Sequence, residues 1–257
     1  MELNNWKTFL EELADPDKIN VGSLHQKDKL NSKFWDVRDK LDSEVSDVLY
    51  SIAKEFFQSL KLDPRIKMKD VTLTGSIASY NWSNASDVDL HILLDFNDLD
   101  NIDLLKDYFK EKTINWNNRH KIFIKGFEVE IYIQDANEPH YSLGIYSIKD
   151  NQWIKKPSKF SVKIDDQAIK RKASNLMEQI DDIYDDFAEH QYRTAKKNAD
   201  RLMKKIKKYR RSGLEKDGVY SVENLVFKVL RRNDYLGKLS SLRIMSYDKT
   251  MSLGEEY

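Results

Sequence analysis

The sequence predicts an α+β protein with a sheet-containing core followed by a helical C-terminal region. The segments "DVTLTGS", "SDVDLHILLDF" and "KIFIKGFEVEIYIQD" have the alternating or continuous apolar pattern of strands. Between Asp165 and Gly213, apolar residues recur every three or four positions, and no Gly or Pro interrupts them. We therefore expect an N-terminal helix and connector over residues 1–30, a core over 31–160 and a C-terminal helical region over 161–257.

The first part of the chain predicts two helices joined by a polar connector. "WKTFLEELA" has the apolar spacing of a short amphipathic helix, and "DPDKINVGSLHQKDKLNS" is the connector. In "DSEVSDVLYSIAKEFFQSLKL", Ser43 is a suitable N-cap, and Pro64 ends the element. The residues expected on the buried face of this helix are Val45, Val48, Leu49, Ile52, Phe56 and Leu60.

The core is expected to follow the order helix, strand, strand, helix, hairpin. The first two strands are those of "DVTLTGS" and "SDVDLHILLDF", and "DLLKDYFKEKTINWNNRH" is helical in pattern. "KIFIKGFEVEIYIQD" predicts two strands that turn at Gly126. "HYSLGIYSIKDNQWIKKP" predicts a further short hairpin before Pro157.

The C-terminal region is expected to contain three helices. One apolar stripe runs from Ala173 to Phe187, and another runs from Ala195 to Tyr209. The register slips between Phe187 and Tyr192, which predicts a bend or a break there. "SVENLVFKVLRRNDYL" predicts the third helix.

Composition excludes several classes of protein and of site. The 257 residues are 40% hydrophobic, which is enough to fill a core. The absence of cysteine excludes disulfides and thiolate zinc sites and favours a reducing, cytoplasmic compartment. No apolar run reaches the roughly 20 residues that span a bilayer, and the first residues lack the features of a signal peptide, so no membrane partner is expected. The formal net charge is zero, so the total charge does not indicate a nucleic-acid partner.

Two aspartates stand one residue apart in an apolar segment. In "SDVDLHILLDF", strand alternation directs Asp87, Asp89 and His91 to one face. Two neighbouring carboxylates repel each other unless a cation lies between them, and a divalent ion with oxygen ligands, most simply Mg²⁺, removes that conflict. The alternative for the aspartates is a solvated edge or loop. His91 is either a neighbour of the ion or of an acceptor, or a hydrogen-bonded structural histidine.

The preceding "TGSI" offers a phosphate site. The strand ends at Gly75, which permits close backbone approach, and a short helix is expected to begin at Ser76. A helix start presents N–H groups and, here, a hydroxyl to a phosphate. Ser86 either orients the carboxylate of Asp87 or closes a turn. Gly75, Ser76 and Ser86 are thus the expected nucleotide-binding residues beside a metal site, as a nucleoside triphosphate with its magnesium requires.

The arrangement Gly-Ser, ten residues, Asp-x-Asp and an apolar run resembles the pattern of the DNA polymerase beta-like nucleotidyltransferase superfamily. The resemblance implies a small mixed sheet flanked by helices, two Mg²⁺ (or Mn²⁺) ions, and attack by an acceptor hydroxyl on the α-phosphate of a nucleoside triphosphate such as ATP. It also implies a third acidic residue on a later strand. "FEVEIYIQD" supplies Glu130, which fits the family pattern, and Glu128 as the alternative. Both glutamates otherwise fit a solvent-facing side of a strand.

Within this superfamily, residues 29–157 and "SVENLVFKVLRRNDYL" are similar to predicted nucleotidyltransferases of tailed-phage genomes, which implies action in the host cytoplasm. Small stand-alone members often carry an Arg soon after Gly-Ser, and "GSIASYNW" has none. We therefore expect Lys or Arg of the helical region to meet the charge of the triphosphate.

The leading hypothesis is a metal-dependent nucleotidyltransferase with Asp87, Asp89 and Glu130 as catalytic metal ligands. Asp89 or Glu130 would help to deprotonate the acceptor hydroxyl, and the C-terminal helices would form one wall of the acceptor cleft. The acceptor is left open: an RNA, a protein, a small molecule or a second nucleotide. Tyr80 and Trp82 either stack on a base or pack against the protein.

Two alternative functions stay open. One is a catalytically inactive nucleotide-binding module or antitoxin-like regulator. The other is a nucleic-acid-binding protein that uses the basic run "KKNADRLMKKIKKYRRS". The same run also fits a solvated helix face, because positive charge is favourable near a helix C-terminus.

Overall fold

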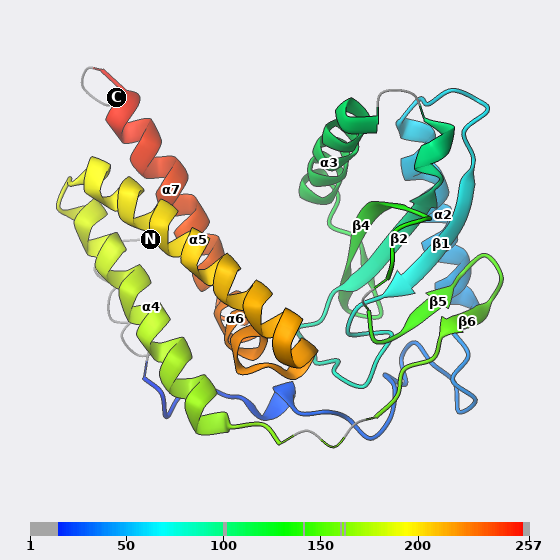
Figure 1. The fold of residues 1–257 in the computed structure, drawn as a ribbon, viewed down its shortest axis with the longest axis horizontal. Helices are drawn as coiled ribbons and strands as arrows, with labels where there is room; N and C mark the ends of the chain where they lie inside the picture. Colours follow the sequence, from blue (N-terminus) through cyan, green and yellow to red (C-terminus); the bar gives the residue numbers. More distant parts are fainter. Residues whose placement is uncertain (1–14, 100–101, 141, 160, 162, 254–257) are drawn as a thin grey trace. The chain divides into compact units, whose positions relative to one another are not determined.

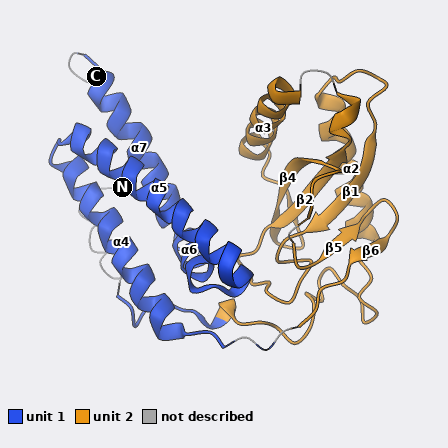
Figure 2. Cartoon of the chain, in the orientation of Figure 1, with its two compact units in different colours: residues 1–22, 161–257 blue, residues 23–160 orange. Residues whose placement is uncertain are grey.

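The computed structural model describes residues 15–99, 102–140, 142–159, 161 and 163–253 (Figure 1). The chain divides into two compact units, shown in two colours in Figure 2. We call residues 23–160 the sheet unit, and residues 1–22 with 161–257 the helical unit. The sequence prediction placed its boundaries after residues 30 and 160. The combination of helices with a mixed sheet confirms the α+β class.

The described residues of the sheet unit contain a six-stranded mixed sheet of order β3-β4-β2-β1-β5-β6. β2 and β4 pair in parallel, whereas β1 pairs antiparallel with both β2 and β5. β3 with β4 and β5 with β6 form the two predicted hairpins. At the first hairpin, Lys125 and Gly126 have φ angles of 51° and 92°, as a two-residue turn of this kind requires. The strands are β1 (Met68–Thr74), β2 (Val88–Leu94), β3 (Phe123–Ile124), β4 (Phe127–Asp135), β5 (Ile145–Ser147) and β6 (Gln152–Lys155).

Helix α2 (Ser43–Ser59) packs on β1 and β2, and helix α3 (Ile102–Arg119) packs on β4 (Figure 1). The hydrophobic core combines apolar residues of α2 with one face of the sheet, so the other sheet face is left for polar side chains. The prediction of α2 is confirmed with two corrections. Asp42, not Ser43, is the N-cap, because its Oδ1 accepts a hydrogen bond from Val45 N at 3.0 Å. Val48, expected on the buried face, is 43% exposed.

The connector near the N-terminus, predicted to be polar, contains buried apolar residues. The predicted helix "WKTFLEELA" lies outside the described residues. The connector after it contains a short 3₁₀ helix, η1 (Gly22–Leu24), and four buried apolar residues, Ile19, Val21, Leu24 and Leu30. These residues are irregularly spaced among mainly polar residues, so no periodicity in the sequence marks them as buried.

The described residues of the helical unit form four long helices rather than the three expected: α4 (Asp166–Ala188), α5 (Tyr192–Asp217), α6 (Val222–Arg232) and α7 (Tyr235–Met251). The break between Phe187 and Tyr192 is confirmed. The expected third helix ends at Arg232, and a new helix starts after Asp234, whose φ is 60°. No helix of the described residues is long and apolar enough to cross a membrane.

Candidate functional site

The polar face of the sheet carries the predicted acidic pair. Asp87 directly precedes β2 instead of lying within it, which corrects the prediction, and Asp89 is the second residue of the strand. Asp89 and His91 are half-buried, whereas Val88 and Leu90 between and beside them are completely buried. The alternation predicted for this segment is therefore confirmed, and the acids occupy the face opposite the hydrophobic core.

Strand register brings the second aspartate beside the later glutamate. Asp89 of β2 is the direct partner of Glu130 of β4 in the parallel pairing, and of Thr74 of β1 in the antiparallel pairing. Adjacent strands lie about 4.8 Å apart, and directly paired residues point to the same face of a sheet. Asp89 and Glu130 therefore lie side by side on the polar face, next to the point where β1 ends.

The turn after β1 is built around the carboxylate of Asp89. Gly75 has a φ of 73°, and a Cβ atom at this position would lie 1.7 Å from Asp89 Oδ2. Only glycine leaves room for the carboxylate there. The residues that follow form a turn, in which Ser79 N donates to Ser76 O at 3.1 Å. The prediction of a helix starting at Ser76 is wrong, so no helix terminus offers its amides at this point.

A pair of serines closes the long loop between β1 and β2. Ser76 Oγ donates a hydrogen bond to Ser86 Oγ at 2.7 Å, and Ser83 N donates to the same oxygen at 2.9 Å. Ser86 is 7% exposed and directly precedes Asp87. The ten-residue spacing seen in the sequence thus brings these two serines together, and Ser86 acts as the closing residue of a turn.

The two candidate glutamates of β4 have different partners. Glu128 Oε1 accepts a hydrogen bond from Lys121 Nζ at 2.6 Å, so its charge is balanced by an ion pair. The Glu130 carboxylate accepts a hydrogen bond from the Tyr132 hydroxyl instead. Because Glu130, and not Glu128, is paired with Asp89, the geometry favours Glu130 as the third acid of the site.

The negative charges of the site act on the pKa of the Tyr132 hydroxyl. Burial raises the pKa of its phenol, and the hydrogen bond and charge of Glu130 and the charges of Asp89 and Asp87 raise that pKa further. All three predicted acids are therefore close enough to act on one hydroxyl. The sequence interpretation missed Tyr132, although strand alternation places it on the same face as Glu130, two residues later.

His91 is held as a neutral, hydrogen-bonded residue. Its Nδ1 lies 2.8 Å from Gln134 Oε1, and its ring stacks on that of Tyr132 with centroids 5.1 Å apart. Burial lowers the pKa of His91 to about 4, so the imidazole is uncharged at neutral pH. Gln134 was also missed, because its contact with His91 depends on the parallel register of β2 and β4, which the sequence does not reveal.

The donor set fits a hard divalent ion, since Asp87, Asp89 and Glu130 present carboxylate oxygens only. In the described part of the chain, no group of three or more His, Asp or Glu side chains is arranged to hold one ion together. Glu130 accepts a hydrogen bond from Tyr132, and the Asp89 carboxylate lies against Gly75. The acids are thus neighbours without a preassembled coordination sphere.

A groove of about 330 Å³ lies between α3 and the later residues of β4. Lys106 and Lys110 of α3 line one side of the groove, and Tyr132 and Gln134 of β4 line the other. Asn117 of α3 fixes the helix to the strand, because its side chain exchanges hydrogen bonds with the backbone N and O of Ile131, both at 3.0 Å. Asp135 and Glu138 also line this groove, and Glu138 Oε1 lies 4.0 Å from Lys106 Nζ, so the charges of the groove are mixed.

The loop aromatics are engaged within the protein. Trp82 Nε1 donates to Lys29 O at 2.9 Å, and both Trp82 and Tyr80 pack against the hydrophobic core. Lys159 Nζ lies 5.2 Å from the centroid of the Tyr80 ring. These contacts favour the packing interpretation of both residues over stacking on a base.

No family model, no curated protein and no solved structure matches this chain. The functional interpretation therefore rests on the residues of the site itself.

Proposed function

We propose that the protein is a metal-dependent nucleotidyltransferase that transfers a nucleoside monophosphate from a nucleoside triphosphate to an acceptor hydroxyl. The observation that carries the proposal is the pairing of Asp89 with Glu130 beside a turn that has room for the Asp89 carboxylate only because Gly75 lacks a side chain. A stable strand has no structural need for two adjacent acids on a half-buried face, because like charges placed directly opposite each other destabilise a sheet.

In this proposal, Asp87, Asp89 and Glu130 hold Mg²⁺ or Mn²⁺. The bound ion supplies neutralisation of the charge that develops on the reacting phosphate oxygens. Tyr132 keeps Glu130 on the site side of β4, and the loop closed by Ser76 and Ser86 fixes the start of β2.

The triphosphate lies along the turn that begins at Gly75, and the Ser76 hydroxyl exchanges its hydrogen bond to Ser86 Oγ for one to a phosphate oxygen. The acceptor oxygen forms a bond to the α-phosphorus, the bond from that phosphorus to the bridging oxygen breaks, and pyrophosphate leaves with the electron pair. The proton of the acceptor hydroxyl passes to the carboxylate of Asp89 or Glu130.

The test is transfer of label from each α-labelled nucleoside triphosphate, with Mg²⁺ or Mn²⁺, to a pool of RNA, protein and small-molecule acceptors. The matched variant is Asp87→Asn with Asp89→Asn, which keeps the size of both side chains and removes their charge. We expect a labelled acceptor with the wild type and at least about a 10³-fold lower rate with the variant. If the wild type binds nucleotide tightly and labels no acceptor, the nucleotide-binding module replaces the enzyme.

A further inference from the structure

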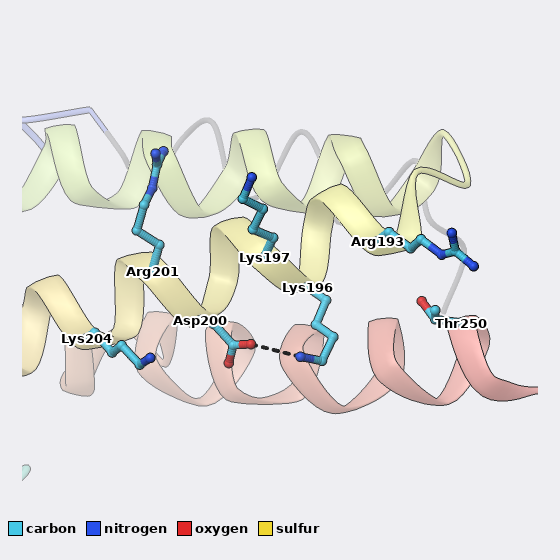
Figure 3. Close-up of a pocket in the computed structure, with 7 residues that line it drawn as sticks. All are labelled: Arg193, Lys196, Lys197, Asp200, Arg201, Lys204 and Thr250. Carbon is cyan, nitrogen blue, oxygen red and sulfur yellow. Dashed lines mark hydrogen bonds and ion pairs between the residues drawn. The ribbon is translucent and has the colours of Figure 1, made fainter.

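A strongly basic groove runs between α5 and α7 in the helical unit. Its volume is about 450 Å³, and Figure 3 shows the side chains that line it. We call it the basic groove. Five of the lining residues are cationic: Arg193, Lys196, Lys197, Arg201 and Lys204. The groove has a far higher density of charge than the chain as a whole, whose formal net charge is zero.

The acid that lines this groove is already neutralised. Asp200 accepts hydrogen bonds from Arg243 Nε at 2.7 Å and from Lys196 Nζ at 3.0 Å, and these partners lower the pKa of its carboxyl. In Figure 3 the dashed line joins Asp200 to Lys196, whereas the other four cations extend from α5 without one. Within the described residues, Arg193 and Lys197 have no carboxylate within ion-pair distance.

The cations continue along α5 as a stripe of exposed residues with helical spacing. The stripe consists of Arg193, Lys197, Arg201, Lys204, Lys208 and Arg211, all of them exposed. Like charges four positions apart on a helix, as in the first three members, destabilise it by about 0.2–0.5 kcal/mol per pair. A solvated helix face has no need of this repulsion, and a polyanion lying along the stripe would remove it.

The stripe fits a regular row of phosphates. Its ends are 18 residues apart, or about 27 Å along the helix, which corresponds to about eight phosphate steps of one duplex strand. None of the large apolar side chains of α5 is exposed, so the stripe itself offers bases no stacking surface. On the α7 side of the basic groove Tyr247 is exposed, and its ring centroid lies 5.8 Å from Lys196 Nζ, but this is a single ring beside a row of six cations. We propose that the basic groove and its stripe bind the phosphate backbone of double-helical nucleic acid without reading its bases.

A second groove beside α5 differs in the charge of its lining residues, and this difference supports the assignment. It lies between α4 and α5 and has a volume of about 360 Å³. Asp182 and Asp186 line it together with Arg201 and Lys205, so its charges are mixed. The α4 side of α5 therefore has two acids beside its cations, with Arg201 shared between the two grooves, whereas the basic groove is lined by a single acid, Asp200.

The experiment measures binding of the full-length protein to short DNA and RNA duplexes, without nucleotide or divalent metal, as the salt concentration is raised. Six phosphate contacts predict about a 10³-fold loss of affinity for DNA between about 50 and 200 mM salt. The variant that neutralises half of the stripe is Arg193→Gln, Lys197→Gln and Lys204→Gln. It should reduce that loss to about 40-fold and leave transfer to a small acceptor, if there is any, unchanged.

A matched control neutralises three exposed lysines elsewhere: Lys54→Gln, Lys67→Gln and Lys163→Gln. The control should keep the salt dependence of the wild type. The proposal is overturned if the two triple variants behave alike, if polyglutamate or anionic vesicles compete as well as a duplex, or if the wild type does not bind a duplex at low salt. Single-stranded oligonucleotides that bind more tightly than duplexes also contradict it.

Discussion

The sheet unit and the helical unit place their charges in opposite ways. In the sheet unit, Asp89 and Glu130 sit at paired positions of neighbouring strands, half-buried and next to each other. In the helical unit, cations such as Lys197 and Lys204 repeat along one exposed face of α5. The first arrangement fixes a few atoms relative to one another, and the second supplies a density of charge in which no single residue is decisive.

This difference teaches how each unit should respond to substitution. A function that depends on the exact positions of a few side chains should be lost when a single functional group among them is changed. A function that depends on charge density should decline in steps with the number of charges, as the salt dependence of the basic groove would show. If substitutions of the acids in the sheet unit lowered activity only gradually, with the number of charges removed, this comparison would be contradicted.

The largest effect is expected for Glu130→Gln. Loss of this carboxylate should lower the rate of nucleotide transfer by about 10³-fold, because it removes a charged ligand of the proposed metal. Glu128→Gln is the matched control on the same face of the same strand, because Glu128 forms an ion pair with Lys121 instead of pairing with Asp89. Its rate should stay within about threefold of the wild type, as surface ion pairs contribute little. Steady-state rates with saturating Mg²⁺ provide the comparison, and equal losses would contradict the choice of Glu130.

The next effect concerns the glycine turn. In Gly75→Ala, the new Cβ overlaps the position of Asp89 Oδ2, so the carboxylate must rotate out of the site. We expect about a 10²-fold lower kcat/KM and a loss of about 1–2 kcal/mol in the free energy of unfolding. Gly126→Ala is the matched control, because its φ is also positive while the nearest atom to its Cβ would be Lys33 Nζ at 3.8 Å. It should lose similar stability and keep its activity; an inactive Gly126→Ala would show that backbone strain alone explains the first result.

A smaller effect is expected from the residue that holds Glu130. Tyr132→Phe keeps the ring stacked on His91 and removes the hydroxyl that Glu130 accepts. The Mg²⁺ concentration for half-maximal rate should rise about tenfold, because Glu130 loses the bond that orients it. Tyr108→Phe removes a hydroxyl that donates to Leu60 O at 2.9 Å in the same unit, and it should leave the Mg²⁺ dependence unchanged. A fall in stability without a change in Mg²⁺ dependence would assign Tyr132 a structural role only.

The elements that the sequence predicts well are those with a strong local pattern. Helix α2, the hairpin at Gly126 and the strand around Asp89 follow from periodicity and turn chemistry. The break between α6 and α7 could not be predicted in this way. The residue with positive φ at the break is Asp234, and no Gly or Pro stands at that position to indicate a helix end. The prediction of a helix start at Ser76 failed for a related reason. The residues after Ser76 form a turn and a long loop, and no local pattern in the sequence distinguishes these from the start of a helix.

The residues of the candidate site could be predicted from the sequence, but most of their contacts could not. Strand alternation correctly places Asp89 and Glu130 on polar faces, since one face of each strand must join the core. The pairing of those strands is a long-range property, and with it come the contacts of His91 with Gln134 and of Glu130 with Tyr132. Local patterns carry no information on which strands become neighbours, so these partners could be found only in the structure.

The smallest effect concerns a partly buried acid of the helical unit. Asp181 of α4 is a partly buried acid: its Oδ2 accepts from Tyr235 at 3.2 Å, while its Oδ1 is buried with no hydrogen-bond partner among the described residues. Burial raises the pKa of Asp181 to about 6. The folded state therefore favours the protonated carboxyl, and the stability that this proton provides is complete below about pH 4 and is lost as the pH rises through about 6.

Asp181→Asn removes the buried charge and keeps an acceptor for Tyr235. At pH 7 we expect it to raise the free energy of unfolding by about 1 kcal/mol, a value reduced for the partial exposure of the group, and at pH 4 we expect no change. Asp182→Asn makes the same charge change at the exposed neighbouring position and should stay within about 0.5 kcal/mol at both pH values. Urea unfolding at the two pH values measures both variants. A gain at pH 7 confined to Asp181→Asn would mean that the helical unit tolerates negative charge only outside its packed interior, whereas a loss would mean that the ionised carboxylate holds Tyr235 in place.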